Sequence, residues 1–169
     1  MLNPIDVNAV LTGGCAIGRY PGQIHEGVAW WIGSCLVVTT HTHRIAVSHD
    51  GHPISVRFHE RLCRGAINAR HYAATVTDLG HATEDSLLAA ARNLGGVPSV
   101  FVSTLGDADT GATVTLTLHD HAGRRLTEDS GLAVIRRMIA EDHVPIPVND
   151  AARGRIEAHR TGPRAEVQR

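Results

Sequence analysis

Histidine is the side chain whose number first suggests chemistry, because this sequence of 169 residues contains 12 of them. Two pairs, His41-x-His43 and His119-x-His121, would place both imidazoles on one side of an extended chain, where side chains repeat every two residues. Such pairs can take part in zinc or copper binding. Neither pair has an obvious third ligand nearby, and both lie at expected turns, so we expect solvated histidines and no metal site.

The three cysteines, Cys15, Cys35 and Cys63, are an odd number at wide spacing. This pattern fits reduced thiols in a cytoplasmic protein better than a disulfide framework. Cys63 follows His59 by one helical turn, and an imidazole at that distance could activate a thiol nucleophile. A buried cysteine on a core helix explains the same spacing without chemistry, and we favour that interpretation.

Two loops combine glycine with residues that could hold an anion or a metal. The segment 12–18 is rich in glycine, but no Gly-Lys-Ser/Thr follows, so it is a poor phosphate-binding loop. Asp107 and Asp109 place two carboxylates at i and i+2, as a hard cation would require. Asp and Gly are also the residues that a tight connection between strands prefers. The spacing by itself leaves both interpretations of this second loop open.

The hydrophobic pattern predicts helices and short strands in alternation. We expect helices over 23–39, 53–69, 83–94 and 127–139. We expect strands over 44–48, 73–79, 99–103 and 112–118. Alternation of this kind implies right-handed crossovers, and the short connection before the last strand makes one strand antiparallel. The predicted fold is α/β, a three-layer sandwich with a four-stranded, mostly parallel mixed sheet between helices.

Length and composition predict one globular domain of ordinary size. All 16 basic residues are Arg, and the net charge of −1 argues against a nucleic-acid binder. The sequence has neither an apolar run long enough for a membrane helix nor a signal-peptide pattern, so we expect no membrane association. We divide the chain into an N-terminal arm (1–20), an α/β domain (21–142) and an Arg-rich tail expected to be disordered (143–169).

Four segments carry a further pattern in a fixed order: 21–33, 47–52, 77–83 and 118–126. The second reads Val-Ser-His-Asp-Gly-His, and the third contains Asp-Leu-Gly followed by a helix start. Together they resemble the first domain of the α-D-phosphohexomutases, the phosphomannomutase/phosphoglucomutase family, in which the second segment usually reads Gly-Arg-Asp-Gly-Arg. The resemblance covers about 120 residues and implies the fold of that domain for residues 21–142.

The same resemblance implies that the catalytic groups of the family are missing here. The family carries its transferred phosphate on a Ser within Thr-Ala-Ser-His-Asn-Pro, and Leu105 stands in that place. The hydroxyls of Ser103 and Thr104 are one or two residues away, which would misplace an in-line transfer. The domains that supply the family's metal site, sugar recognition and phosphate clamp exceed the length of this chain. We therefore expect no catalytic residue, cofactor or metal, and we do not interpret Asp107 and Asp109 as the family's metal loop.

Our hypothesis is a catalytically inactive phosphohexomutase-like domain that binds a protein partner or assembles with itself. In the family this domain packs against its neighbours, so an isolated copy exposes a face that favours complexes. Trp30 and Trp31 are adjacent on a helix and cannot both face one core, which makes one of them a candidate interface anchor.

Two alternatives remain open. The chain could be one piece of a split mutase whose remaining domains come from another chain. It could also be a sensor that binds a hexose phosphate at the ends of its strands. The residues expected to bind that ligand are His49, Asp50, Gly51, His52 and Asp107.

Overall fold

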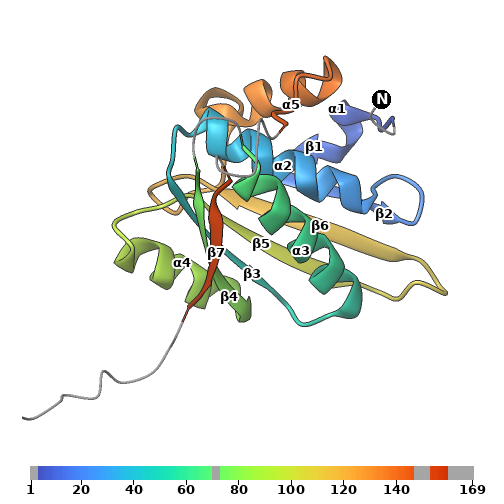
Figure 1. Ribbon diagram of the computed structural model, residues 1–169. Helices are drawn as coiled ribbons and strands as arrows, with labels where there is room; N and C mark the ends of the chain where they lie inside the picture. The colour runs from blue at the N-terminus through green and yellow to red at the C-terminus, as the bar shows by residue number, and fades with distance from the viewer. Residues whose placement is uncertain (1–3, 70–72, 147–152, 160–169) are drawn as a thin grey trace, which may run out of the picture.

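The computed structural model describes residues 4–69, 73–146 and 153–159, coloured along the chain in Figure 1. Its helices are α1 (Val7–Val10), α2 (Glu26–Thr39), α3 (Pro53–Ile67), α4 (Glu84–Asn93), the π-helical turn η1 (Glu128–Leu132) and α5 (Ala133–Ala140). Its strands are β1 (Leu11–Thr12), β2 (Cys15–Tyr20), β3 (Arg44–His49), β4 (Thr75–His81), β5 (Ser99–Leu105), β6 (Ala112–His119) and β7 (Arg155–Ala158). Every helix and strand predicted from the sequence is present, with ends shifted by a few residues.

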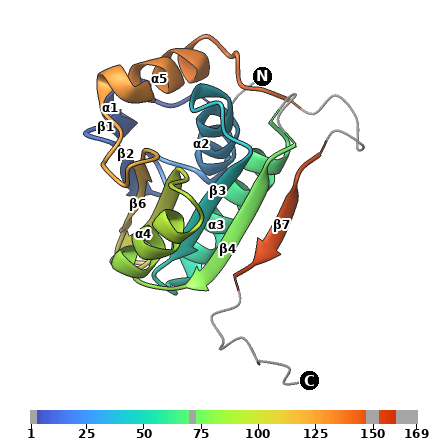
Figure 2. The same cartoon turned by 90° about the vertical axis from the view of Figure 1, so that its left-hand side faces the viewer.

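One mixed sheet contains all seven strands in the order β1-β2-β6-β5-β3-β4-β7. Strands β5, β3, β4 and β7 are parallel neighbours, whereas β6 pairs antiparallel with both β5 and β2. Figure 2 shows the sheet between α4 on one side and α2 with α3 on the other. The predicted three-layer α/β class is confirmed, but the expected number of four strands was too low.

The additional strands come from the segments that we placed outside the domain. Strand β2, in the expected arm, pairs with β6 over its full length, from Cys15 opposite Thr117 to Tyr20 opposite Ala112. Strand β7, in the tail expected to be disordered, pairs with the outer edge of β4. The same physical reason explains both additional strands. Without β2 and β7, the backbone N–H and C=O groups along the outer sides of β6 and β4 would have no hydrogen-bond partners in the sheet. Residues 160–169 of the tail lie outside the described residues.

Helices α2 and α3 form the tightest contact of the structure. Helix α2 is buried on almost every side, since it packs against α3 and α5 and its side chains share one core cluster with residues of the sheet. Gly33 of α2 faces the carbonyl of Leu62, and Gly65 of α3 faces the carbonyl of Trp30, so closely that a Cβ atom at either glycine would overlap that carbonyl. The two backbones therefore touch through glycine, which fixes the position of α3 over β3 and β4.

Local signals set the starts of the helices as the sequence predicts. The side chain of Thr83 accepts a hydrogen bond from the N–H of Ser86 at the start of α4, and Pro53 occupies the first turn of α3. The side chain of Thr127 accepts from the N–H of Ser130 at the start of η1. Within the described part of the chain, no helix combines the length and the apolar character that a membrane crossing requires.

Candidate functional site

The candidate site lies at the carboxyl ends of the neighbouring parallel strands β5, β3 and β4. Open α/β sheets bind their ligands in the crevice outside the carboxyl ends of such strands. The turn 50–52 follows β3, and the loop 106–111 follows β5. Most residues that we expected to bind a ligand lie in these two connections.

Asp50 connects the two strand ends to each other. Its Oδ2 accepts a hydrogen bond of 2.8 Å from the N–H of Thr104, and its Oδ1 accepts one of 3.0 Å from the N–H of His52. Partial burial would raise the pKa of Asp50, but these hydrogen bonds outweigh it and hold the pKa below its usual value. The carboxylate is therefore ionised at neutral pH and engaged by the backbone on both oxygens.

The histidines beside Asp50 also bind the backbone. Nδ1 of His49 accepts from the N–H of Gly51 at 3.1 Å, and Nδ1 of His52 accepts from the N–H of Ile54 at 3.1 Å. Gly51 has a φ of +86°, which favours glycine in this turn. Burial, with the neighbouring imidazole of His59, lowers the pKa of His49 and disfavours its protonated form. The geometry thus gives both histidines a structural task in the turn.

Asp107 has a local role in the loop between β5 and β6. Its Oδ1 accepts from the N–H groups of Asp109 and Thr110, at 3.0 and 2.8 Å, and from the hydroxyl of Thr110 at 2.8 Å. These bonds are those of a carboxylate that stabilises a turn. Of the two interpretations left open by the sequence, the geometry favours the turn.

A cavity of about 820 Å³ lies between the strand ends and helix α4. Of the five predicted ligand-binding residues, only Asp50 lines it. His81, Phe101 and His159 on its wall were not predicted from the sequence, although His81 follows directly on the Asp-Leu-Gly segment. The rings of His49 and His81 stack with their centroids 6.3 Å apart. Among the described residues that line the cavity there is no Arg, and its nitrogen-bearing side chains are those of His81, His159 and Asn93.

The two side chains of the pair His119-x-His121 bind different partners in the fold. His119 is 2% exposed, and its Nε2 lies 2.9 Å from Oε1 of Glu84. The ring nitrogens of His121 lie 3.0 Å and 3.3 Å from the carbonyl oxygens of Gly96 and Thr40. Each imidazole thus connects separate elements of the fold.

Burial lowers the pKa of His119, although the carboxylate of Glu84 opposes the shift. The neutral form is thus favoured in the fold, and stability is lost as the pH falls below the ordinary histidine value of about 6.5. When the pH is lowered from 7.5 to 5, we expect the free energy of unfolding to fall less in the variant His119→Gln than in the native chain. Urea denaturation at both pH values measures this difference, and equal losses would contradict the prediction.

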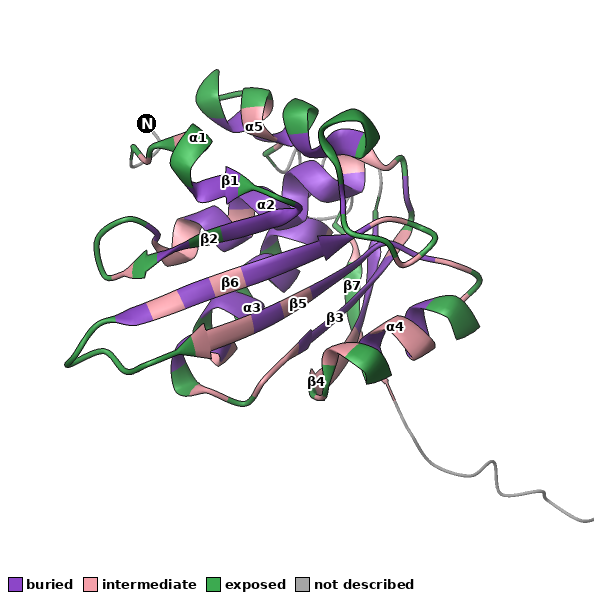
Figure 3. Cartoon of the chain, turned by 180° about the vertical axis from the view of Figure 1, so that it is seen from behind, coloured by how far each residue is buried: buried purple, intermediate pink, exposed green. Residues whose placement is uncertain are grey.

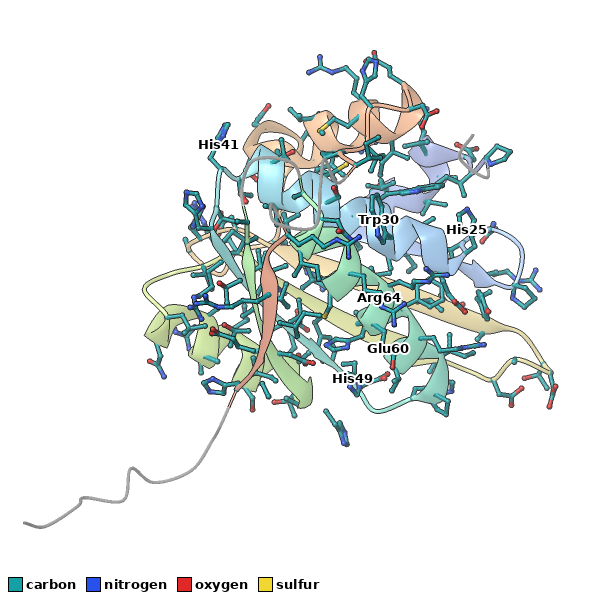
Figure 4. The ribbon with its side chains drawn as sticks, viewed as in Figure 1. His25, Trp30, His41, His49, Glu60 and Arg64 are labelled. Atoms are coloured by element: carbon teal, nitrogen blue, oxygen red, sulfur yellow. The ribbon has the colours of Figure 1, made fainter. Side chains whose placement is uncertain are left out.

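The two tryptophans differ in exposure. Trp31 is 5% exposed and contacts His25 edge to face, with ring centroids 5.0 Å apart, so it packs in the core of this chain. Trp30 is half-buried on α2, and Figure 4 shows it on the side of the helix that faces away from the sheet. Its role in an interface stays a prediction.

A second feature is a sheet face without a covering helix. In the described part of the chain, Figure 3 shows β2 and β6 unobstructed on the side opposite α2 and α3. The register places two rows of side chains there, Ile17–Thr115–Ser103 and Arg19–Thr113–Leu105. We call these six residues the open sheet face. All six are exposed or half-buried, and Leu105 is 81% exposed.

Comparison with solved structures identifies the fold. The chain superposes on a phosphoglucomutase/phosphomannomutase family protein from Burkholderia thailandensis with a TM-score of 0.70 and 16% identity, over 92% of this chain and 34% of that one. A protein assigned as a phosphomannomutase from Thermus thermophilus gives 0.65 and 14%, over 86% and 31%. The fold is phosphohexomutase-like. No protein-family model matches the chain, and no curated protein matches its sequence.

The phosphohexomutase-like fold of this chain spans about a third of the length of those two structures. The resemblance stated from the sequence is thereby confirmed at the level of the fold. In this fold Leu105 is the last residue of β5, directly before the loop that contains Asp107. Its neighbour Thr104 is engaged by Asp50 through its N–H, and its hydroxyl lies 2.7 Å from that of Ser55.

Proposed function

We propose that this chain is a non-catalytic phosphohexomutase-like domain that binds a second copy of itself through the open sheet face. The observation that carries the proposal is the exposure of Leu105, 81%, on a sheet face that no helix covers in the described residues. Contiguous exposed apolar surface marks interaction sites, and Leu105 together with Ile17, which is 37% exposed, supplies the apolar part of this face.

The position of Leu105 supports the absence of catalysis. A hydrocarbon side chain can neither accept nor release a phosphoryl group, and the hydroxyl of Thr104 already bonds to Ser55. Phosphoryl transfer depends on positioning and on positive charge around the phosphate. The cavity has no Arg among its described lining residues, and hexose phosphate binding stays a prediction.

The chemistry of the open sheet face favours a second copy as the occupant. Arg19 is its single charged residue, and the others carry hydroxyl or hydrocarbon groups. Such a face has no charge pattern that would select a strongly acidic or basic partner. A two-fold axis places the same residues against each other, so that a nearly neutral face of aliphatic and hydroxyl groups is its own complement. The net charge of −1 adds little repulsion between copies.

Sedimentation equilibrium on the full chain tests the proposal. We expect a concentration-dependent dimer for the native chain and at least a tenfold larger dimer dissociation constant for Leu105→Glu, since each copy would bury a carboxylate in the interface. The matched control is Val134→Glu on α5, a residue 38% exposed and outside the open sheet face, which should dimerise as the native chain does. A native chain that stays monomeric, or a Leu105→Glu variant that dimerises normally, would refute the proposal.

The prediction of a cytoplasmic location belongs to the same proposal. Cys15, Cys35 and Cys63 are all buried free thiols, which suits a reducing compartment.

A further inference from the structure

An imidazole, a thiol and a carboxylate lie close together near the carboxyl ends of β3 and β4. His59 and Cys63 are one turn apart on α3, so both face the sheet from the same side of the helix. Asp78 lies on β4, against which α3 packs. One donor atom from each residue lies within 4.8 Å of the other two. The spacing of His59 and Cys63 was visible in the sequence, but the carboxylate that completes the group comes from a distant segment.

Two of the three distances between these atoms are close to those in a tetrahedral metal site. Nε2 of His59 lies 3.0 Å from Oδ1 of Asp78 and 3.8 Å from Sγ of Cys63. Zinc binds nitrogen and oxygen at about 2.0–2.2 Å and sulfur at about 2.3 Å, which places neighbouring ligand atoms roughly 3.3–3.6 Å apart. Nε2 of His59 is thus within about half an ångström of this spacing from each of the other two atoms, and Sγ of Cys63 and the carboxylate of Asp78 lie within 4.8 Å of each other.

The surroundings hold these ligands in place. His59 is 4% exposed and Cys63 2%, so neither side chain can rotate freely into solvent. The N–H of Gly80 donates to Oδ1 of Asp78 at 2.7 Å and orients the carboxylate. The ring of His49 contacts the ring of His59 at a centroid distance of 4.7 Å. Fixed orientation of the ligands by their neighbours is typical of protein metal sites.

Room for an ion and a water exists beside the three residues. A cavity of about 240 Å³ adjoins them, and its other walls are Glu60, Arg64 and Ile156. Figure 4 shows Glu60 and Arg64 on α3 near His49, on the side of α3 that faces the viewer in Figure 1. Three protein ligands and one open position make a site whose fourth ligand is water.

We propose that His59, Cys63 and Asp78 form a Zn²⁺ site. A thiolate, an imidazole and a carboxylate are a ligand set that zinc accepts, whereas Mg²⁺ and Ca²⁺ require oxygen ligands. The thiolate and the carboxylate together neutralise the two charges of the ion, which removes much of the cost of burying it. Without metal, Nε2–H of His59 donates to Asp78, and the thiol of Cys63 remains protonated in its buried position.

Binding of Zn²⁺ removes protons from its ligands and replaces a hydrogen bond between them by bonds to the metal. Cys63 releases its proton to solvent and binds as thiolate, while His59 binds through the lone pair of Nε2, as the tautomer that carries its proton on Nδ1. Asp78 exchanges the hydrogen bond from His59 for the metal. At least the thiol proton of Cys63 is released for each Zn²⁺ bound. Burial raises the pKa of the Cys63 thiol, so the ion must supply the free energy of this deprotonation.

Cobalt titration of the reduced, chelator-treated full chain tests the site, because a cysteine thiolate bound to Co²⁺ gives an intense near-ultraviolet charge-transfer band. We expect one equivalent of Co²⁺ to produce this band and Zn²⁺ to abolish it. Cys63→Ser should remove the band and weaken zinc binding at least about 100-fold, since loss of a supporting neighbour alone costs 10–100-fold. The control Cys35→Ala removes another buried thiol and should keep the band.

Asp78→Asn keeps the test decisive if Cys63→Ser does not fold. The side chain of Asp78 is 28% exposed, so this change is mild, and it should weaken zinc binding while the thiolate band remains. A native chain that gives no thiolate band overturns the proposal, since the metal would then bind to other histidines. An Asp78→Asn variant with native affinity overturns the assignment of three ligands.

Discussion

Replacement of Gly65 by Ala should lower the free energy of unfolding by about 2 kcal/mol or more, although Ala is the better helix former. Its Cβ would overlap the carbonyl of Trp30 on α2, which is backbone and cannot rotate away. Overpacking of a well-packed core costs about 1–3 kcal/mol and sometimes more, against a helix-propensity gain of about 1 kcal/mol. Gly33 meets the carbonyl of Leu62 in the same contact, so the helices cannot move apart without opening the core.

Urea denaturation followed by circular dichroism measures this effect. The control is Gly27→Ala in the first turn of α2, where the new Cβ would meet only side chains, mainly the imidazole of His25. That control should change stability far less, because a side chain can shift. A Gly65→Ala variant at least as stable as the native chain would show that α2 and α3 do not pack through this glycine.

Replacement of Asp50 by Ala should remove about 2 kcal/mol of stability at neutral pH. The carboxylate accepts the N–H groups of Thr104 and His52, and hydrogen bonds to a charged group contribute about 1.5–3 kcal/mol each before allowance for partial exposure. The variant would leave both N–H groups without their partner and release the end of β5 from the turn after β3. We expect the loop 106–111 to exchange its amide protons faster as a result.

The pH dependence of this effect follows from the lowered pKa of Asp50. A carboxyl group whose pKa is depressed in the fold stabilises it above the unfolded value, about 3.9, and loses that contribution as the pH falls through the folded value. The difference between native chain and variant should therefore narrow below about pH 4. Asp107→Ala serves as control, because its partners are local and exposed, and it should cost much less. An Asp50→Ala effect that does not change with pH would contradict the assigned role.

Much of the fold could be predicted from local signals. The apolar stripe of α3, the cap at Thr83 and the Asp-Gly turn after β3 each depend on residues close in sequence. Strand β2 escaped prediction because Gly18 and Arg19 interrupt its apolar run. Strand β7 has four residues that are mostly exposed, so only its pairing with β4 makes it a strand.

The candidate sites depended on contacts that the sequence does not display. Asp50 was predicted as a ligand-binding residue, but its partner Thr104 lies 54 residues away and engages it in the fold. The Asp-Leu-Gly segment was noted for its resemblance alone, and the packing of α3 on β4 then brings Asp78 to His59. A helical spacing can thus suggest two ligands, whereas the third comes from tertiary structure.

The two edge strands of the sheet limit how many copies of the chain can assemble. The outer strands are β1, with two residues, and β7, with four, of which Arg155 and Glu157 carry charges. Such short edges offer few free backbone groups to a strand from another molecule. Growth by addition of strands, the route to open-ended fibres, is therefore disfavoured at both edges. Association through the open sheet face would instead close after two copies, since a two-fold contact uses the same surface of both.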